Sequence, residues 1–119
     1  MKKTIVLISI ILCFAFLQGC IGRNVPLSEY SGGEFLSSSD SPDGKYTVNA
    51  YIYRGSATEA DTVRAELVDN DSGTQKNIYL KYREQDARCE WLDNTTVVIN
   101  GIELDVRSDT YDWRRDKTD

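Results

Sequence analysis

The sequence contains no histidine among its 119 residues. Histidine is the commonest general base in enzymes and the commonest transition-metal ligand, so its absence removes the usual histidine-based sites. A serine or cysteine nucleophile would lack the base that normally activates it. The composition therefore argues against an enzyme, and we expect neither a metal ion nor another cofactor.

Cysteine is also scarce, with only Cys13, Cys20 and Cys89 in the chain. The first two belong to an N-terminal segment with a separate role, described below, so Cys89 remains alone and no intramolecular disulfide is expected. Cys89 alternates with Ala87 and Trp91 in a predicted strand. This pattern favours a buried, unpaired thiol, and a disulfide between two chains is the alternative.

Basic residues are outnumbered by acidic ones. Without Lys2 and Lys3, the chain has 12 basic and 19 acidic residues and a net charge of −7. Nucleic-acid binding needs a basic surface, so we expect no nucleic-acid partner. The charge suits solubility, a basic partner or cations.

The N-terminus shows the order of features found in an export signal. Lys2 and Lys3 form a short basic region, and an apolar run from Ile5 to Leu17 follows, interrupted only by Ser9. This run is shorter than the roughly 20 residues that a membrane-spanning helix needs, but it matches the apolar region of a signal peptide. We therefore predict a helical signal peptide over residues 1–19, with an uncleaved signal anchor as the alternative.

The end of this segment, Leu17-Gln18-Gly19-Cys20, resembles the lipobox of bacterial lipoproteins. The resemblance implies a diacylglycerol linked by a thioether to Cys20 and cleavage between Gly19 and Cys20. Only a thiol can form that thioether, and two acyl chains give a stable membrane anchor where one chain does not. The protein would then be anchored to the cell membrane through Cys20, on the extracytoplasmic side.

The rest of the chain alternates between apolar and polar residues with a period of two, the pattern of strands with one buried face. No stretch shows helical spacing, and we expect no helix in the mature domain. We predict an all-β domain over residues 34–113, built as a single antiparallel meander of five or six strands that is strongly twisted or partly rolled. The alternating apolar residues are Val48, Ala50, Ile52, Val63, Ala65, Leu67, Ile78, Leu80, Tyr82, Cys89, Trp91, Val97, Ile99, Ile102, Leu104 and Val106.

Turn and linker signals divide the chain further. Asn100-Gly101 lies between two alternating runs and predicts a type I′ hairpin, in which both central residues have positive φ. Residues 20–33 are rich in serine and glycine and are expected to form a flexible tether. Residues 114–119 are expected to be a frayed C-terminal tail.

A series of turn and strand residues runs through the predicted domain in a fixed order: Ser41-Pro42-Asp43-Gly44-Lys45-Tyr46, Ala50-Tyr51, Trp91, Asp93, Val98-Ile99-Asn100-Gly101, Asp109 and Tyr111. With this series, the stretch from Ser41 to Tyr111 resembles a family of small, uncharacterised lipoproteins, mainly from Gram-positive bacteria. No activity is assigned to that family, so the resemblance implies location and fold only.

Three tyrosines are the candidate binding residues. Tyr51, Tyr53 and Tyr79 are predicted to project from the face of the sheet opposite the aliphatic one. They either form a surface for a ligand or supply the second layer of a rolled sheet. The ligand or partner, a protein or another envelope component, is not identified by these residues.

Carboxylates on the predicted strands offer the alternative of a small envelope hydrolase, because paired carboxylates can cleave a sugar polymer. The candidates are Glu66, Glu90, Glu103 and Asp105. Neighbouring arginines favour ion pairs on a solvated face instead, and these are Arg64, Arg88 and Arg107. The preferred interpretation is a non-catalytic envelope protein that binds a partner.

Overall fold

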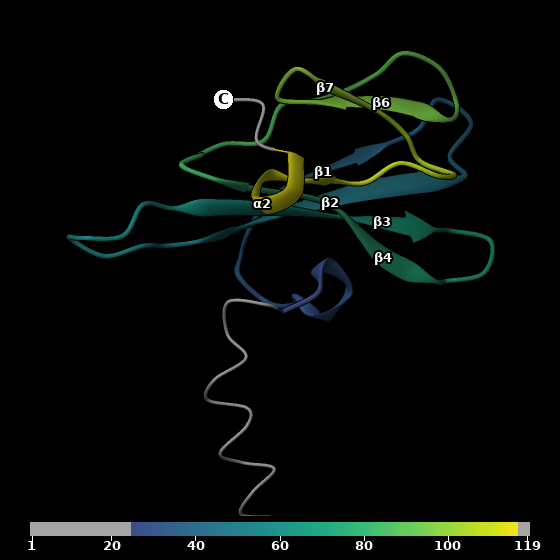
Figure 1. Ribbon diagram of the computed structural model, residues 1–119. Helices are drawn as coiled ribbons and strands as arrows, with labels where there is room; N and C mark the ends of the chain where they lie inside the picture. Colours follow the sequence, from purple (N-terminus) through teal and green to yellow (C-terminus); the bar gives the residue numbers. More distant parts are fainter. Residues whose placement is uncertain (1–24, 117–119) are drawn as a thin grey trace, which may run out of the picture.

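The computed structural model of the chain describes residues 25–116, in which eight strands form two sheets (Figure 1). The all-β class predicted from the sequence is confirmed. One sheet has the order β1-β2-β3-β4-β8 and the other the order β5-β6-β7. The elements are η1 (Leu27–Glu29, a 3₁₀ helix), β1 (Glu34–Asp40), β2 (Tyr46–Tyr53), β3 (Thr62–Asp69), β4 (Gln75–Tyr82), β5 (Cys89–Trp91), β6 (Thr96–Ile99), β7 (Ile102–Asp105), β8 (Tyr111–Asp112) and α2 (Trp113–Asp116).

Strands β1 to β4 form an antiparallel meander, as predicted. Their alternation places Val48, Ala50 and Ile52 on one face of β2, fully or almost fully buried. The pairing of β2 with β3 sets Val48 opposite Leu67 and Ile52 opposite Val63, so the apolar side chains of both strands point to the same face. This face of the sheet is the main contributor to the core.

The expectation of a single sheet is wrong, because β5, β6 and β7 form a separate sheet that lies over the apolar face of the first (Figure 1). The segment 83–88 makes the change of sheet, and it begins at Arg83, which has a φ of 65°. Such a positive φ is uncommon outside glycine and turns the chain sharply. The second sheet supplies Val97, Ile99 and Leu104 to the shared core.

A bulge in β4 overturns the predicted direction of Tyr79. Ala65 pairs with Tyr79, and the next residue of β3, Glu66, pairs with Asn77, so Ile78 is an extra residue on β4. The extra residue shifts the alternation, and both Ile78 and Tyr79 are fully buried in the core. Tyr79 stacks on Tyr111 with ring centroids 5.5 Å apart.

The predicted Asn100-Gly101 hairpin is confirmed. Asn100 has a φ of 47° and Gly101 a φ of 85°, and the flanking residues Ile99 and Ile102 pair across the turn. The Asn100 side chain also accepts a hydrogen bond from the backbone N–H of Arg88 at 2.8 Å and donates one to the Glu84 carboxylate at 2.8 Å. The turn therefore connects β6-β7 to the segment that links the two sheets.

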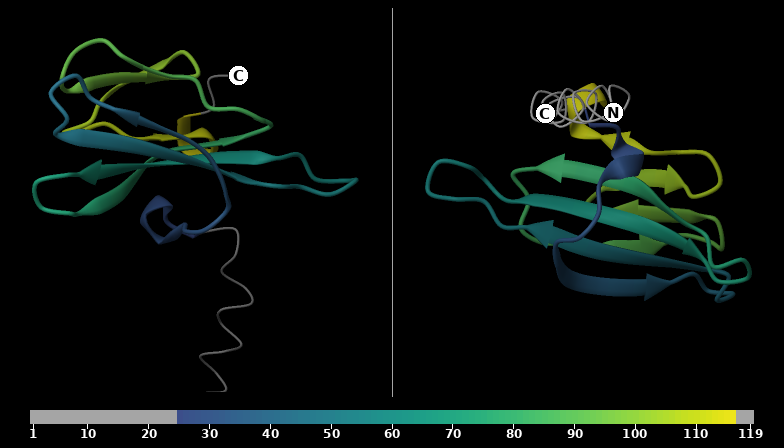
Figure 2. Two further views of the ribbon diagram at one scale, coloured as in Figure 1. Left: turned by 180° about the vertical axis from the view of Figure 1, so that it is seen from behind. Right: turned by 90° about the horizontal axis from the view of Figure 1, so that it is seen from below.

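The N-terminal stretch from Val25 to Gly33, here called the strap, crosses the five-stranded sheet on the face opposite the three-stranded sheet (Figure 2). It carries η1 and reaches β1 at Glu34. This stretch is the described part of the expected tether of residues 20–33, and side chains of the sheet hold its backbone, as described below. The 3₁₀ helix η1 ends at Glu29, because the next residue, Tyr30, has an extended backbone with a φ of −71° and a ψ of 138°.

The C-terminal segment adds two elements that the sequence analysis did not predict. Strand β8 pairs in parallel with β4, so that Tyr79 lies opposite Tyr111 and the sheet is not a pure meander. The short helix α2 follows, and its Trp113 stacks on Tyr82 with ring centroids 5.2 Å apart. Residues 114–116 of the expected frayed tail belong to this helix.

The predicted signal peptide, its cleavage site at Gly19 and Cys20, and the lipid-attachment site lie outside the described residues. Within residues 25–116, no helix is long and apolar enough to cross a membrane.

Candidate functional site

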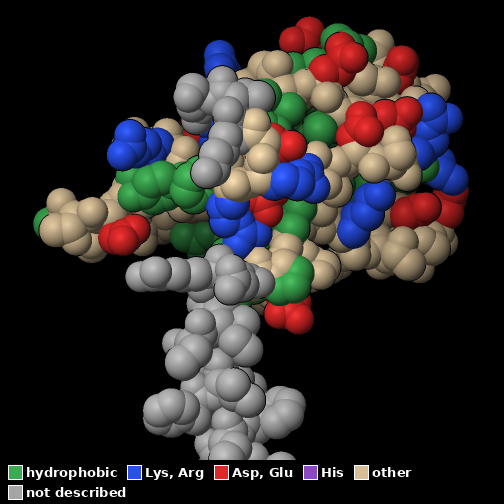
Figure 3. Space-filling view, viewed as in Figure 1, with side chains coloured by type: hydrophobic (Ala, Val, Ile, Leu, Met, Phe, Trp, Pro, Cys, Tyr) green, Lys and Arg blue, Asp and Glu red, His purple; other side chains and the backbone are tan. Residues whose placement is uncertain are grey.

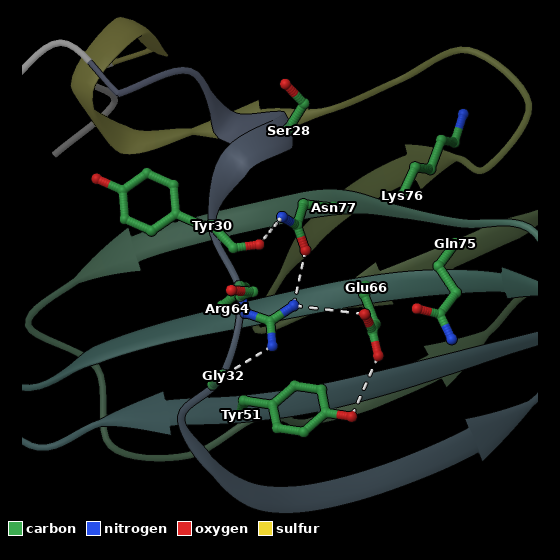
Figure 4. Close-up of a pocket in the computed structure, with 10 residues that line it drawn as sticks. Ser28, Tyr30, Gly32, Tyr51, Arg64, Glu66, Gln75, Lys76 and Asn77 are labelled. Atoms are coloured by element: carbon green, nitrogen blue, oxygen red, sulfur yellow. Dashed lines mark hydrogen bonds and ion pairs between the residues drawn. The ribbon is translucent and has the colours of Figure 1, made fainter. Parts of the chain in front are cut away.

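A polar pocket of about 380 Å³ lies between the strap and the five-stranded sheet (Figure 4). Strands β2, β3 and β4 supply its floor, and the strap forms one wall. Its lining residues are Ser28, Tyr30, Ser31, Gly32, Tyr51, Arg64, Glu66, Gln75, Lys76 and Asn77.

Arg64 lies at the centre of the pocket floor and is buried, with 3% of its surface exposed. Its Nη1 donates to Asn77 Oδ1 at 2.8 Å and its Nη2 donates to the Gly32 carbonyl at 2.7 Å. The guanidinium also lies over the ring of Tyr51, 4.4 Å from the centroid. A planar, permanently charged group with several donors suits this mixture of stacking and hydrogen bonding.

Glu66 partly neutralises the charge of Arg64. One carboxylate oxygen accepts a hydrogen bond from the Tyr51 hydroxyl at 3.1 Å, and the other lies 3.5 Å from Arg64 Nη1. Burial and the bond to Glu66 raise the pKa of Tyr51, so its hydroxyl keeps its proton and acts as a donor here. Arg64, Glu66, Tyr51 and Asn77 form one connected polar cluster.

The strap is held by its backbone carbonyl groups, which accept hydrogen bonds from side chains of the domain. Asn77 Nδ2 donates to the carbonyls of Leu27 and Tyr30 at 2.9 and 2.7 Å. The Tyr53 hydroxyl donates to the Ser31 carbonyl at 2.7 Å. Buried carbonyl groups require such partners, so the polar side chains on this face allow the strap to pack on the sheet.

Arg114 of α2 fastens the beginning of the strap. Its Nη1 donates to the Val25 carbonyl at 2.9 Å and to the Tyr30 hydroxyl at 3.2 Å. Asp112 orients the guanidinium through two hydrogen bonds, of 2.9 Å from Nε and 2.6 Å from Nη2. These bonds lower the pKa of Asp112, which is therefore ionised at neutral pH.

The three predicted binding tyrosines do not share one surface. Tyr51 and Tyr53 lie on the strap side of the sheet, half-buried, and both hydroxyls are hydrogen-bonded within the protein. Tyr79 lies on the other face, in the core, and its hydroxyl donates to the Glu84 carboxylate. Burial, followed by the bond to Glu84, raises the pKa of Tyr79.

The four candidate carboxylates are also separated. Glu66 lies in the pocket on β3, whereas Glu90 and Glu103 flank Val98 on the outward face of the three-stranded sheet. Asp105 binds the Arg107 guanidinium at 2.9 Å, and this contact lowers the pKa of Asp105 to about 2. None of the other three candidates lies in the pocket beside Glu66, as a pair for glycoside hydrolysis would require.

Cys89 is a free thiol that packs, partly buried, against the core together with Ala87 and Trp91. Burial raises its pKa, which disfavours the reactive thiolate. Across residues 25–116, no group of three or more acidic or cysteine side chains is placed to hold a metal ion.

Arg64 and Asn77 were missed as functional residues by the sequence analysis, although Arg64 was named as an ion-pair partner. A signal was available, because both are polar residues in the middle of strands whose other face is aliphatic. The alternation alone does not predict which segment covers these two residues. Gly32 of the strap is 32 positions from Arg64 in the sequence, and Tyr30 is 47 positions from Asn77.

These features define the class of the molecule as a small two-sheet β domain with an N-terminal strap and a polar pocket beneath it. The chain belongs to a family of unknown function, DUF5412, which matches residues 1–116. No curated protein and no solved structure matches the chain.

Proposed function

We propose that the protein is a lipid-anchored, non-catalytic binding protein on the extracytoplasmic side of the cell membrane. The observation that carries the proposal is the N-terminal order of Lys2-Lys3, an apolar run and Leu17-Gln18-Gly19-Cys20. The family match includes this region as well as the β domain. Diacylglycerol on Cys20 would supply the two acyl chains that stable anchoring needs.

The geometry of the domain supports an anchored protein. Val25, only five positions after Cys20, is already bound to the domain through Arg114. Very little chain is therefore left between the proposed lipid and the folded part, and the strap attaches that short linker firmly to the sheet.

The contacts of the pocket support binding rather than catalysis. The charged and hydroxyl groups of Arg64, Glu66 and Tyr51 bond to one another and to the strap, which fixes their positions. Groups in such a network lose little freedom when they meet a polar ligand, but they do not present an activated nucleophile or base.

Replacement of the lipid-attachment residue tests the proposal. In cells fed an alkyne-tagged fatty acid, the wild-type protein should carry the tag and fractionate with membranes. Cys20→Ser should remove the tag and leave an uncleaved precursor, because serine cannot form the thioether. Cys89→Ser is the matched control and should label like the wild type. Equal labelling of Cys20→Ser and the wild type would contradict the proposal.

A further inference from the structure

The strap side of the five-stranded sheet is a surface without a covering sheet. Strap and pocket occupy part of it, and the rest is open along β1, β2 and β3. Residues of this side alternate with those that face the core, and they are Phe35, Ser38, Asp40, Thr47, Asn49, Tyr51, Tyr53, Thr62, Arg64, Glu66, Val68, Gln75, Asn77, Leu80, Tyr82 and Asp112.

We propose that this surface lies against the membrane and contacts the lipid head groups. The inference rests on the proposed anchor at Cys20, and it adds a defined orientation of the domain to it. Five residue steps separate Cys20 from Val25, and a fully extended chain spans at most about 3.3–3.6 Å per residue, or about 17–18 Å here. The acyl chains therefore enter the bilayer within that distance of the strap.

The length of this linker decides which side faces the membrane. Strap and three-stranded sheet lie on opposite sides of the five-stranded sheet (Figure 1). Packed sheets are about 10 Å apart, and the strap and the outer side chains add further layers on either side. The linker starts where Val25 bonds to Arg114 of α2, beside the edge strand β8. For the three-stranded sheet to face the bilayer, the linker would have to run from there past both sheets, which would use up most of its reach.

The chemistry of the strap side fits a lipid surface. Four of its sheet residues are charged, namely Asp40, Arg64, Glu66 and Asp112. Arg64 pairs with Glu66, and Asp112 pairs with Arg114 of α2. Phe35 is 58% exposed and packs edge-on against Tyr51, with ring centroids 5.9 Å apart. An exposed aromatic ring beside a tyrosine is the kind of group that settles at the interface between head groups and acyl chains.

The acidic residues of the domain are concentrated elsewhere. Over β6 and β7, on the side away from the strap, acidic side chains gather at the surface (Figure 3). On the strap itself the acidic residue is Glu29. Anionic lipids would repel the acidic side more than the strap side, where two of the acidic side chains are paired with arginines, so charge and linker length favour the same orientation.

Site-directed spin labels measure the orientation directly. The lipidated protein, in a Cys89→Ala background, is reconstituted into phosphatidylglycerol and phosphatidylethanolamine vesicles that contain a nickel-chelating lipid. Labels at Ser38→Cys and Gln75→Cys report on the strap side, and labels at Glu90→Cys and Glu103→Cys report on the other sheet; all four positions are exposed. We expect nickel-dependent relaxation to be several-fold larger at the first two positions.

Equal relaxation at the four positions, or larger relaxation at Glu90 and Glu103, would overturn the inference. Flotation of the same samples with the vesicles separates this result from failure of the anchor, because an unlipidated protein would not float at all. A floating protein without the expected pattern would refute the orientation alone.

Two exposed large apolar side chains among residues 25–116 provide a matched pair of variants. Phe35 is 58% exposed on the strap side, and Leu92 is 54% exposed in the hairpin between β5 and β6. Phe35→Ser should reduce the relaxation at the Gln75 label, whereas Leu92→Ser should leave it unchanged. If both variants behave alike, Phe35 does not contact the membrane and the proposed surface is wrong.

Discussion

Arg64 links three parts of the molecule through a single side chain. Its guanidinium bonds to the strap at Gly32 and to β4 at Asn77, and it stacks on Tyr51 of β2. Arg64 is predicted from the sequence as half of a solvated ion pair, and it does lie beside Glu66. It is buried because the strap covers it, and no local pattern in the sequence indicates that cover.

Arg64→Ala should therefore destabilise the domain strongly. The change leaves the Gly32 carbonyl and the Asn77 and Glu66 side chains without their partner in a buried place, and removing one member of a buried pair costs about 3–5 kcal/mol. Urea unfolding measures the loss. Arg107→Ala is the control, because the ion pair of Arg107 with Asp105 is exposed, and it should change the unfolding midpoint little. Similar losses for the two variants would show that Arg64 does not hold the strap.

Asp112 gives the C-terminal attachment a dependence on pH. Its hydrogen bonds from Arg114 lower its pKa in the folded protein below the ordinary carboxyl value of about 3.9. A lowered folded-state pKa contributes stability that is fully present above the unfolded pKa and is lost as the pH falls through the folded pKa. The stability difference between the wild type and Asp112→Asn should thus be largest near neutral pH.

This difference should shrink as the pH is lowered from about 4 towards the folded pKa of Asp112. Urea unfolding of both proteins at a series of pH values measures it. A difference that stays constant over this range would mean that the charge of Asp112 does not stabilise the fold.

At the level of elements, the Asn100-Gly101 hairpin follows from the local sequence. The pairing of β8 with β4, which are distant in the sequence, does not. The Asn100-Gly101 turn is predictable because the type I′ geometry restricts which residues fit it. Strand β8 consists of two residues and pairs with a strand 32 positions earlier, so nothing near Tyr111 indicates it. The bulge at Ile78 is equally hidden, since a period-two pattern continues through it.

Gly101→Val tests how much the hairpin contributes. An added Cβ would meet no atom within 4 Å, so the cost comes from the backbone conformation, with a φ of 85°, rather than from a clash. Left-handed geometry costs a β-branched residue about 1–2 kcal/mol or more, and each kcal/mol lowers the melting temperature of such a domain by about 4–8 °C. Gly101→Asn should cost less, because asparagine adopts positive φ more readily. If Gly101→Val melts like the wild type in calorimetry, the turn is not important for stability.

At the scale of the whole molecule, the alternation predicts the all-β class but not the number of sheets. Each strand shows one apolar face, and those faces can be buried by rolling one sheet or by stacking two. Two features lead to two stacked sheets rather than one rolled sheet. Arg83 has a positive φ at the start of the link 83–88, and the Asn100 side chain bonds to Glu84 and Arg88 within that link. These contacts join residues that are distant in sequence and have no periodic signature.

The strap connects the proposed lipid anchor to the folded domain. The strap runs from the proposed lipid end of the chain across the sheet, and its carbonyl groups are held from β2, β3, β4 and α2. A lipid on Cys20 would thus be attached almost directly to a rigid surface. The position of that surface at the membrane depends on the lipid at Cys20.

Mass spectrometry of the N-terminal peptide from protein recovered in the membrane fraction detects this lipid and its position. We expect a peptide that begins at Cys20 and carries the mass of a diacylglycerol on its thiol. A peptide that begins at Met1, or one that contains an unmodified Cys20, would contradict it.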